Sequence, residues 1–182
     1  MKMVWHLLFA VLVFPAWAQD WKVDYSRSDI RFIIKQMNVP VEGGFGRFNV
    51  QMVFEPSKPE LGVFRVEVDV ASIETGSEDG NGEVKRPAWF DMARYPKLSF
   101  VSKTIRREAP GRFTMIGDLA VKGRTRPLTV PLLLMPQRDG GWLASGRFAL
   151  KRSDFDIGSG EWADPSVVAN DIDGRFKMML IP

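Results

Sequence analysis

Residues Gly117 to Pro127 read GDLAVKGRTRP, and this stretch decides how the rest of the chain is interpreted. Its three cations, Lys122, Arg124 and Arg126, lie within five residues beside a glycine, as in a loop that binds phosphate or nucleic acid. The flanking residues favour a different interpretation, because an apolar–polar alternation runs up to Val121 and resumes after Pro127. Period-two alternation on both sides of a short glycine turn is typical of a β-hairpin. The cations are then either solvated turn residues or a rim that meets a charged ligand headgroup.

The same alternation recurs along most of the chain. Gly-, Pro- and Asp-rich stretches such as Gly43-Gly44 and Asp139-Gly140-Gly141 separate the runs, and we read the first of these as a bend or bulge at a barrel corner. Eight antiparallel strands with short connections predict an all-β sandwich or closed barrel. A barrel is favoured because closure removes exposed edges and eight strands leave room for one ligand. The eight runs are Asp29–Gln36, Phe48–Glu55, Phe64–Val70, Leu98–Thr104, Phe113–Val121, Leu128–Leu134, Trp142–Leu150 and Ile172–Leu180.

One segment, Ser77 to Tyr95, interrupts the alternation. It is acidic and Gly-rich at first, and Pro87 then stands where the first residue of a helix is often proline. We predict a loop followed by a short helix over Ala88 to Met92. Its aromatic pair, Trp89 and Phe90, either plugs the end of the core or forms a lid over a pocket.

The first 18 residues have the pattern of an export signal. Lys2 precedes the apolar run Leu7 to Phe14, and Ala16-Trp17-Ala18 resembles a signal-peptidase site. We therefore predict a signal peptide at residues 1–18, one domain at residues 19–182, and a periplasmic location. The apolar run is shorter than the roughly 20 residues that span a bilayer, so no membrane-spanning segment is expected. A formal net charge of +3 is too small to indicate a nucleic-acid-binding protein.

The absence of two residue types restricts the chemistry. The chain has no cysteine, and its only histidine, His6, lies in the predicted signal peptide. Thiol and histidine catalysis, ordinary zinc sites and His-ligated haem are therefore not expected, and we predict no metal, no cofactor and no enzymatic activity. The remaining catalytic alternative uses the carboxylates of Asp154, Asp156 or Glu161, although Asp154 and Asp156 fit a structural turn better.

Six short blocks occur in an order that resembles the YceI-like family of periplasmic polyisoprenoid-binding proteins, over residues 20–182. The resemblance implies a lipocalin-like eight-stranded barrel with an apolar interior channel for a long isoprenoid or another amphiphile, and several members behave as dimers. The blocks are Trp21–Asp24 with Ser28–Phe32, Gly44–Phe48, Val70–Gly76, Trp89–Asp91 with Tyr95–Phe100, Gly117–Leu119 with Lys122–Pro127, and Lys151–Phe155.

With that ligand class, the inward-facing residues become candidates for the binding site, and a prenyl phosphate or a quinone becomes the expected ligand. Arg47, Arg124 and Arg126 are candidates to meet a polar headgroup. The alternative is an accessory protein of a membrane complex, with a packed barrel and an outward apolar patch at Leu132–Leu134 that also suits a homodimer contact. The predicted apolar lining is Phe32, Ile34, Phe48, Phe64, Val66, Phe100, Met115, Trp142, Phe148, Phe176 and Met178, with Trp89 and Phe90 at the mouth.

Overall fold

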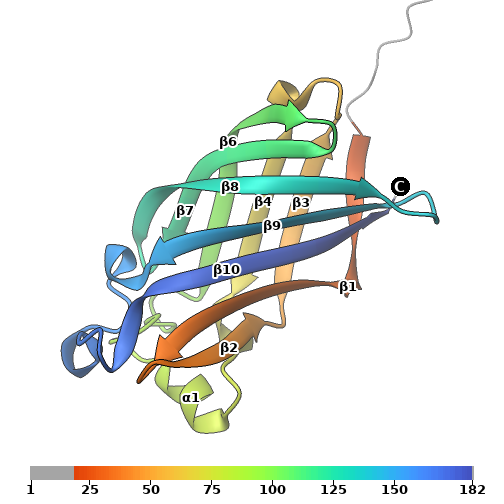
Figure 1. Cartoon of the computed structure of the whole chain (residues 1–182). Helices are drawn as coiled ribbons and strands as arrows, with labels where there is room; N and C mark the ends of the chain where they lie inside the picture. The colour runs from red at the N-terminus through yellow and green to blue at the C-terminus, as the bar shows by residue number, and fades with distance from the viewer. Residues whose placement is uncertain (1–18, 182) are drawn as a thin grey trace, which may run out of the picture.

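The structure, a computed structural model, describes residues 19–181 and contains ten strands and one short α-helix over that range (Figure 1). The predicted signal peptide, residues 1–18, lies outside the described residues. The elements are β1 Gln19–Gln36, β2 Val39–Phe45, β3 Phe48–Phe54, β4 Val63–Asp69, β5 Ile73–Glu74, α1 Glu78–Glu83, β6 Lys97–Ala109, β7 Arg112–Val121, β8 Arg124–Pro136, β9 Trp142–Lys151 and β10 Val168–Ile181.

Eight of the strands close into an antiparallel barrel, which confirms the predicted fold class. Their order is β1, β3, β4, β6, β7, β8, β9 and β10, and β10 pairs back onto β1 to complete the ring. The quoted stretch forms the β7–β8 hairpin, because Lys122 and Gly123 both adopt positive φ and join strands paired from Val121–Arg124 onward. Two positive-φ residues between two strands are the geometry that suits a tight hairpin.

On the side away from β10, strand β1 pairs with two different strands, and this widens one end of the barrel. Residues 19–21 pair with β3, whereas Ile30 to Gln36 pair with β2. Between these two parts β1 is irregular, and the Tyr25 hydroxyl bridges to β3 by hydrogen bonds with the Asn49 side chain and the Val50 N–H. The β1–β2 hairpin therefore extends beyond β3 and adds wall at that end.

The prediction of a bend or bulge at Gly43-Gly44 is wrong, because both glycines lie within β2. The strand is held by β1 on one side and by β5 on the other. A Cβ at Gly43 would collide with the Phe32 ring and lie 2.6 Å from the Glu74 carbonyl oxygen. The glycine is therefore needed for close packing, not for a turn.

The short helix is present, but not where Pro87 predicted it. Helix α1 spans Glu78–Glu83, and residues 84–95 form consecutive turns in which Asp91 has a positive φ. The Ser77 hydroxyl caps the helix by accepting a hydrogen bond from the Gly80 N–H at 3.1 Å. This cap, together with acidic residues in the first turn, stabilises a helix that contains two glycines.

The barrel interior is filled at one end only. Near the first residues of β1 and the last residues of β10, large side chains pack without exposure, among them Met52, Phe54, Met115 and Met178. The other end, around Ile30–Gln36 and residues 168–174, holds a cavity instead. Within residues 19–181 no helix has the length and apolar character needed to cross a bilayer.

Candidate ligand-binding site

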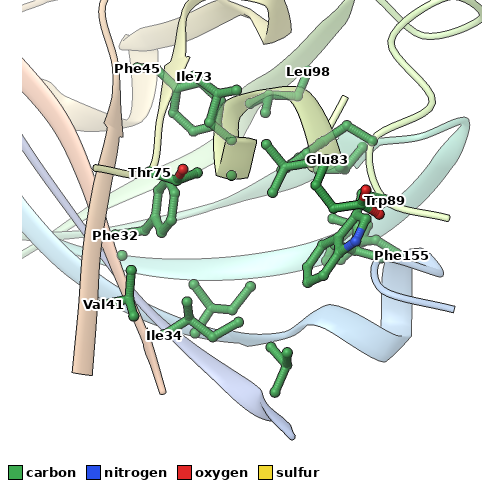
Figure 2. Close-up of a pocket in the computed structure, with 18 of the residues that line it drawn as sticks. Phe32, Ile34, Val41, Phe45, Ile73, Thr75, Glu83, Trp89, Leu98 and Phe155 are labelled. Atoms are coloured by element: carbon green, nitrogen blue, oxygen red, sulfur yellow. The ribbon is translucent and has the colours of Figure 1, made fainter. Parts of the chain in front are cut away.

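The cavity at the widened end of the barrel has a volume of about 830 Å³ and mostly apolar walls. This volume is typical of a small-molecule site. In Figure 2, Phe32, Ile34 and Val41 from the β1–β2 hairpin face Trp89 and Phe155 across the space, with Phe45, Ile73 and Leu98 at one side.

Two aromatic rings line the cavity because glycines lie beside them on the neighbouring strands. Phe32 of β1 pairs with Gly43 of β2, and Phe148 of β9 pairs with Gly174 of β10. A Cβ at either glycine would collide with the paired ring. The rings therefore lie against the wall, so that the interior is left open for a ligand.

Helix α1 covers one side of the cavity and is attached to β5 by Asn81. The Asn81 Oδ1 accepts hydrogen bonds from the Thr75 N–H at 2.7 Å and from the Thr75 hydroxyl at 2.9 Å. The Asn81 amide donates in turn to Glu74 at 2.8 Å. These bonds hold the helix at the cavity wall, to which the apolar residues Ile73 and Val84 also belong.

The loop between β9 and β10 forms another side, and one buried arginine organises it. Arg152 is 3 % exposed and has no ion pair within the part of the chain that the structure describes. Burial lowers the pKa of its guanidinium group from the ordinary value. All its donor nitrogens instead meet main-chain carbonyls: Nε donates to Ala169, Nη1 to Ile157 and Gly158, and Nη2 to Trp162 and Val168, at 2.6–3.1 Å.

This loop joins the segment that carries the aromatic pair. The N–H groups of Gly158 and Ser159 donate to the Ala88 carbonyl at 2.8 and 2.9 Å. The Trp89 and Trp162 rings lie 5.6 Å apart, and Trp89 lines the cavity while it is 8 % exposed. Its Nε1 is buried and has no hydrogen-bond partner among residues 19–181.

The charged side chains around the cavity are mainly acidic. Glu78, Asp79 and Glu83 belong to α1, and Arg86 follows it. Glu83 accepts a hydrogen bond from the Trp162 Nε1 and forms an ion pair with Arg86, both at 3.1 Å. Arg31 also borders the cavity, but its side chain lies beside Gly44 on the outer face, because it alternates with the inward-facing Phe32. The carboxylates thus outnumber the cations at this end.

The structure brings five of the thirteen predicted apolar residues together in the cavity wall, namely Phe32, Ile34, Trp89, Phe90 and Phe148. The other eight lie outside this wall. Six are buried in the packed core: Phe64, Val66, Phe100, Met115, Phe176 and Met178. Phe48 and Trp142 are partly buried against that core. Contact of any of the thirteen with a ligand remains a prediction.

Several residues of the wall were not predicted. Val41 and Phe45 come from β2 and lie on the same face of that strand. Their alternation was not recognised in the sequence, because Gly43 and Gly44 between them have the composition of a turn. Thr75 directly follows the short strand β5, which has too few residues to show any period. Phe155 and Ile157 lie in and after a 3-10 turn at Arg152–Phe155, where alternation does not apply.

The predicted headgroup cations lie away from the cavity wall. Arg47 forms an ion pair with Asp69 at 2.9 Å, and Arg124 lies 3.9 Å from Asp156. Arg126 is exposed on β8. None of the three lines the cavity, so their binding of a headgroup remains a prediction.

The three carboxylates of the catalytic alternative also lie outside the cavity wall. Asp156 ends the 3-10 turn with a positive φ, and Lys122 donates to its carbonyl oxygen at 2.6 Å. Asp154 lies within the same turn, as the structural interpretation of these two residues predicted. Glu161 is exposed in the following loop.

Comparison with known proteins gives consistent results over most of the chain. Residues 21–179 match the YceI-like domain. The chain is 26% identical over 169 residues to Protein YceI of Escherichia coli O157:H7, covering 86% of this chain and 87% of the relative. It is similar to the crystal structure of Burkholderia cenocepacia BcnA, with 35% identity, a TM-score of 0.83 and coverage of 87% and 99%. A polyisoprenoid binding domain from Saccharophagus degradans has the same fold, with 13% identity, a TM-score of 0.69 and coverage of 90% and 98%.

Proposed function

The chain belongs to the YceI-like family, and on this basis we propose that it is a non-catalytic carrier that holds an isoprenoid lipid or a similar long-chain amphiphile in the cavity. The observation that carries the proposal is the apolar space of about 830 Å³, which is open although the other end of the barrel is tightly packed. The description of the Saccharophagus degradans relative as a polyisoprenoid binding domain supports a prenyl chain as the ligand.

The walls suit a hydrocarbon chain better than a polar substrate. Each methylene group removed from water contributes about 0.8 kcal/mol, so a prenyl chain gains affinity from length alone. Part of this gain offsets the loss of translational and rotational freedom on binding, which costs at least about 4 kcal/mol. The chain, rather than the headgroup, supplies most of the affinity.

The charges near α1 support an uncharged headgroup. Glu78 and Asp79 have no ion-pair partner among the described residues. Of the two cations of the wall, Arg86 is paired with Glu83 and Arg31 lies beside Gly44 on the outer face. A phosphate there would face like charge, which is unfavourable. A quinone or prenol head is therefore the better candidate than a prenyl phosphate.

The periplasm is the proposed location, on the signal-like pattern of residues 1–18. N-terminal sequencing of the exported protein is expected to begin at Gln19. A chain that begins at Met1 would contradict this part of the proposal.

Ligand titration tests the carrier function. Trp89 and Trp162 lie at the cavity, so a prenyl alcohol such as geranylgeraniol is expected to change the tryptophan fluorescence saturably. Val41→Phe fills part of the cavity and is expected to lower the affinity by about 2 kcal/mol, the equivalent of two or three methylene groups.

Val39→Phe provides the matched control, because Val39 has the same orientation on β2 but is 62% exposed and lies outside the wall. Its affinity is expected to equal that of the wild type. If neither variant changes the affinity, or if no saturable signal occurs, the proposed site is wrong.

A further inference from the structure

On the outer wall of the barrel, strands β8 and β9 are hydrogen-bonded over only part of their length, and we call the unpaired part the β8–β9 seam. These strands pair only from Leu133–Ser145 to Pro136–Trp142, whereas β8 pairs with β7 from Arg124 to Leu133, and β9 pairs with β10 along its whole length. Pro127 and Pro131 lie in the part of β8 that does not pair with β9, as expected because proline lacks the N–H that a paired strand needs. Figure 1 shows β8, β9 and β10 side by side across the front of the barrel.

An open groove of about 800 Å³ lies over the start of this seam. The groove is lined by four cationic residues, Arg112, Arg147, Arg175 and Lys177, and by two carboxylates, Asp29 and Glu108. Its lining therefore has a formal net charge of +2. Within residues 21–181 only Arg175 among the four cations has an ion pair, at 2.6 Å from Glu42.

Three arginines form one row across the strands, and among the described residues only Arg175 of the three is compensated by a carboxylate, that of Glu42. Arg147, Arg175 and Arg31 lie directly opposite one another on β9, β10 and β1. Like charges in one cross-strand row destabilise a sheet. An anionic surface that lies against such a row reduces the repulsion between its positive charges.

Apolar side chains are interleaved with these cations. Leu133 lies between Arg112 of β7 and Ser145 of β9 in the next cross-strand row, and Lys177 follows on β10. Leu133 is 36% exposed and Met135, two residues further along β8, is 39% exposed. Exposed apolar side chains among Arg and Lys are the pattern of surfaces that lie on anionic bilayers.

We propose that this face, defined by Arg31, Arg112, Leu133, Arg147 and Lys177, docks the protein on an anionic phospholipid bilayer. The choice of a bilayer over an acidic protein rests on the proposed function, because a long-chain lipid must be taken from a membrane or delivered to one. It also rests on the groove itself, which reaches the inward-facing Phe113 and Phe176 where the strand pairing stops.

Vesicle flotation tests the proposal with the wild-type protein. Binding is expected to phosphatidylcholine vesicles that contain phosphatidylglycerol, and not to phosphatidylcholine alone, and added salt is expected to weaken it. The double variant Arg112→Gln/Arg147→Gln is expected to lower the partition coefficient about fivefold for each charge removed. Leu133→Ser is expected to lower it as well.

The controls lie on or near β4, on the opposite side of the barrel. Lys58→Gln/Arg65→Gln removes the same charge, and Val63→Ser replaces an apolar side chain that is 42% exposed. Both controls are expected to bind vesicles as the wild type does. Equal binding to both kinds of vesicle, or equal losses in face and control variants, overturns the proposal.

Two further results would also overturn it. If vesicle binding is absent and Arg112→Gln/Arg147→Gln changes the molar mass in solution, the face is a contact between two copies. If an acidic protein binds the face and vesicles do not, the partner is a protein. Geranylgeraniol affinity in vesicle-free buffer is measured separately, so failure of the docking surface is distinguishable from failure of the proposed function.

Discussion

Arg152 is expected to determine whether the β9–β10 loop keeps its shape, and Arg152→Met is the substitution that tests this. Methionine retains much of the side-chain volume but removes every donor. The variant leaves the buried carbonyls of Ile157, Gly158 and Val168, and the partly buried carbonyls of Trp162 and Ala169, without the guanidinium group. Each orphaned carbonyl costs about 1–3 kcal/mol unless water replaces the donor.

The net loss of stability is smaller than the sum of these costs, because the native guanidinium group is itself desolvated without a carboxylate partner. Removal of one member of a buried charged interaction typically destabilises a protein by about 3–5 kcal/mol, and we expect Arg152→Met to fall in this range. For a domain of this size the melting temperature then falls on the order of 10 °C. Affinity for the lipid falls too, because the loop carries Phe155 and Ile157 of the cavity wall.

Thermal and urea unfolding measure the stability, and Lys151→Met provides the control because Lys151 is an exposed neighbour of the same charge. Arg152→Lys is expected to lie between the wild type and Arg152→Met, since an ammonium group has three donors instead of five. A loss below about 1 kcal/mol for Arg152→Met, or a loss equal to that of Lys151→Met, refutes the assigned role.

Three further predictions concern the cavity and the surface. Gly43→Ala is expected to destabilise the protein by about 1–3 kcal/mol, because its Cβ collides with the Phe32 ring; unchanged urea unfolding would contradict this. Trp89→Phe is expected to leave the melting temperature nearly unchanged, because Nε1 makes no hydrogen bond that would be lost; a large fall would indicate an unrecognised partner. Hydrogen bonds from Ser26, then Arg27, hold the pKa of Asp24 below 3.8. The ionised Asp24 carboxylate therefore stabilises the fold at pH values above its ordinary pKa, and this contribution is lost as the pH falls below about 4. Asp24→Asn is expected to make the melting temperature depend less on pH in this acid range. If the wild type and the variant show the same dependence, the hydrogen bonds of Asp24 do not contribute to stability.

The barrel could be predicted from the sequence because period-two alternation is set locally, strand by strand. The β7–β8 hairpin is the clearest case, since Lys122-Gly123 supplies both the turn and the register. Strand β2 was missed for a physical reason: Gly43-Gly44 has the composition of a turn, but its glycines serve contact with an aromatic ring. The helix was misplaced because the cap at Ser77 and the tie through Asn81 outweigh the intrinsic preferences of the segment.

The candidate site was only partly predictable, because alternation identifies which side chains face inward but not which of them pack. Phe32 and Phe64 have the same pattern in the sequence, yet Phe32 lines the cavity and Phe64 lies in the packed core. What separates them is the divergence of β1 from β3, a long-range pairing that no local signal reports. Arg152 was likewise missed, since its sequence gives no sign that its partners are main-chain carbonyls.

The most direct test of the carrier function is mass spectrometry of an organic extract of the exported protein, purified without detergent. We expect the wild type to release one class of long-chain prenyl lipid in an amount close to that of the protein, and Val41→Phe to release much less. Val39→Phe is expected to release as much as the wild type. An extract of the wild type that contains no long-chain lipid, from a protein that also fails to bind geranylgeraniol, would contradict the account.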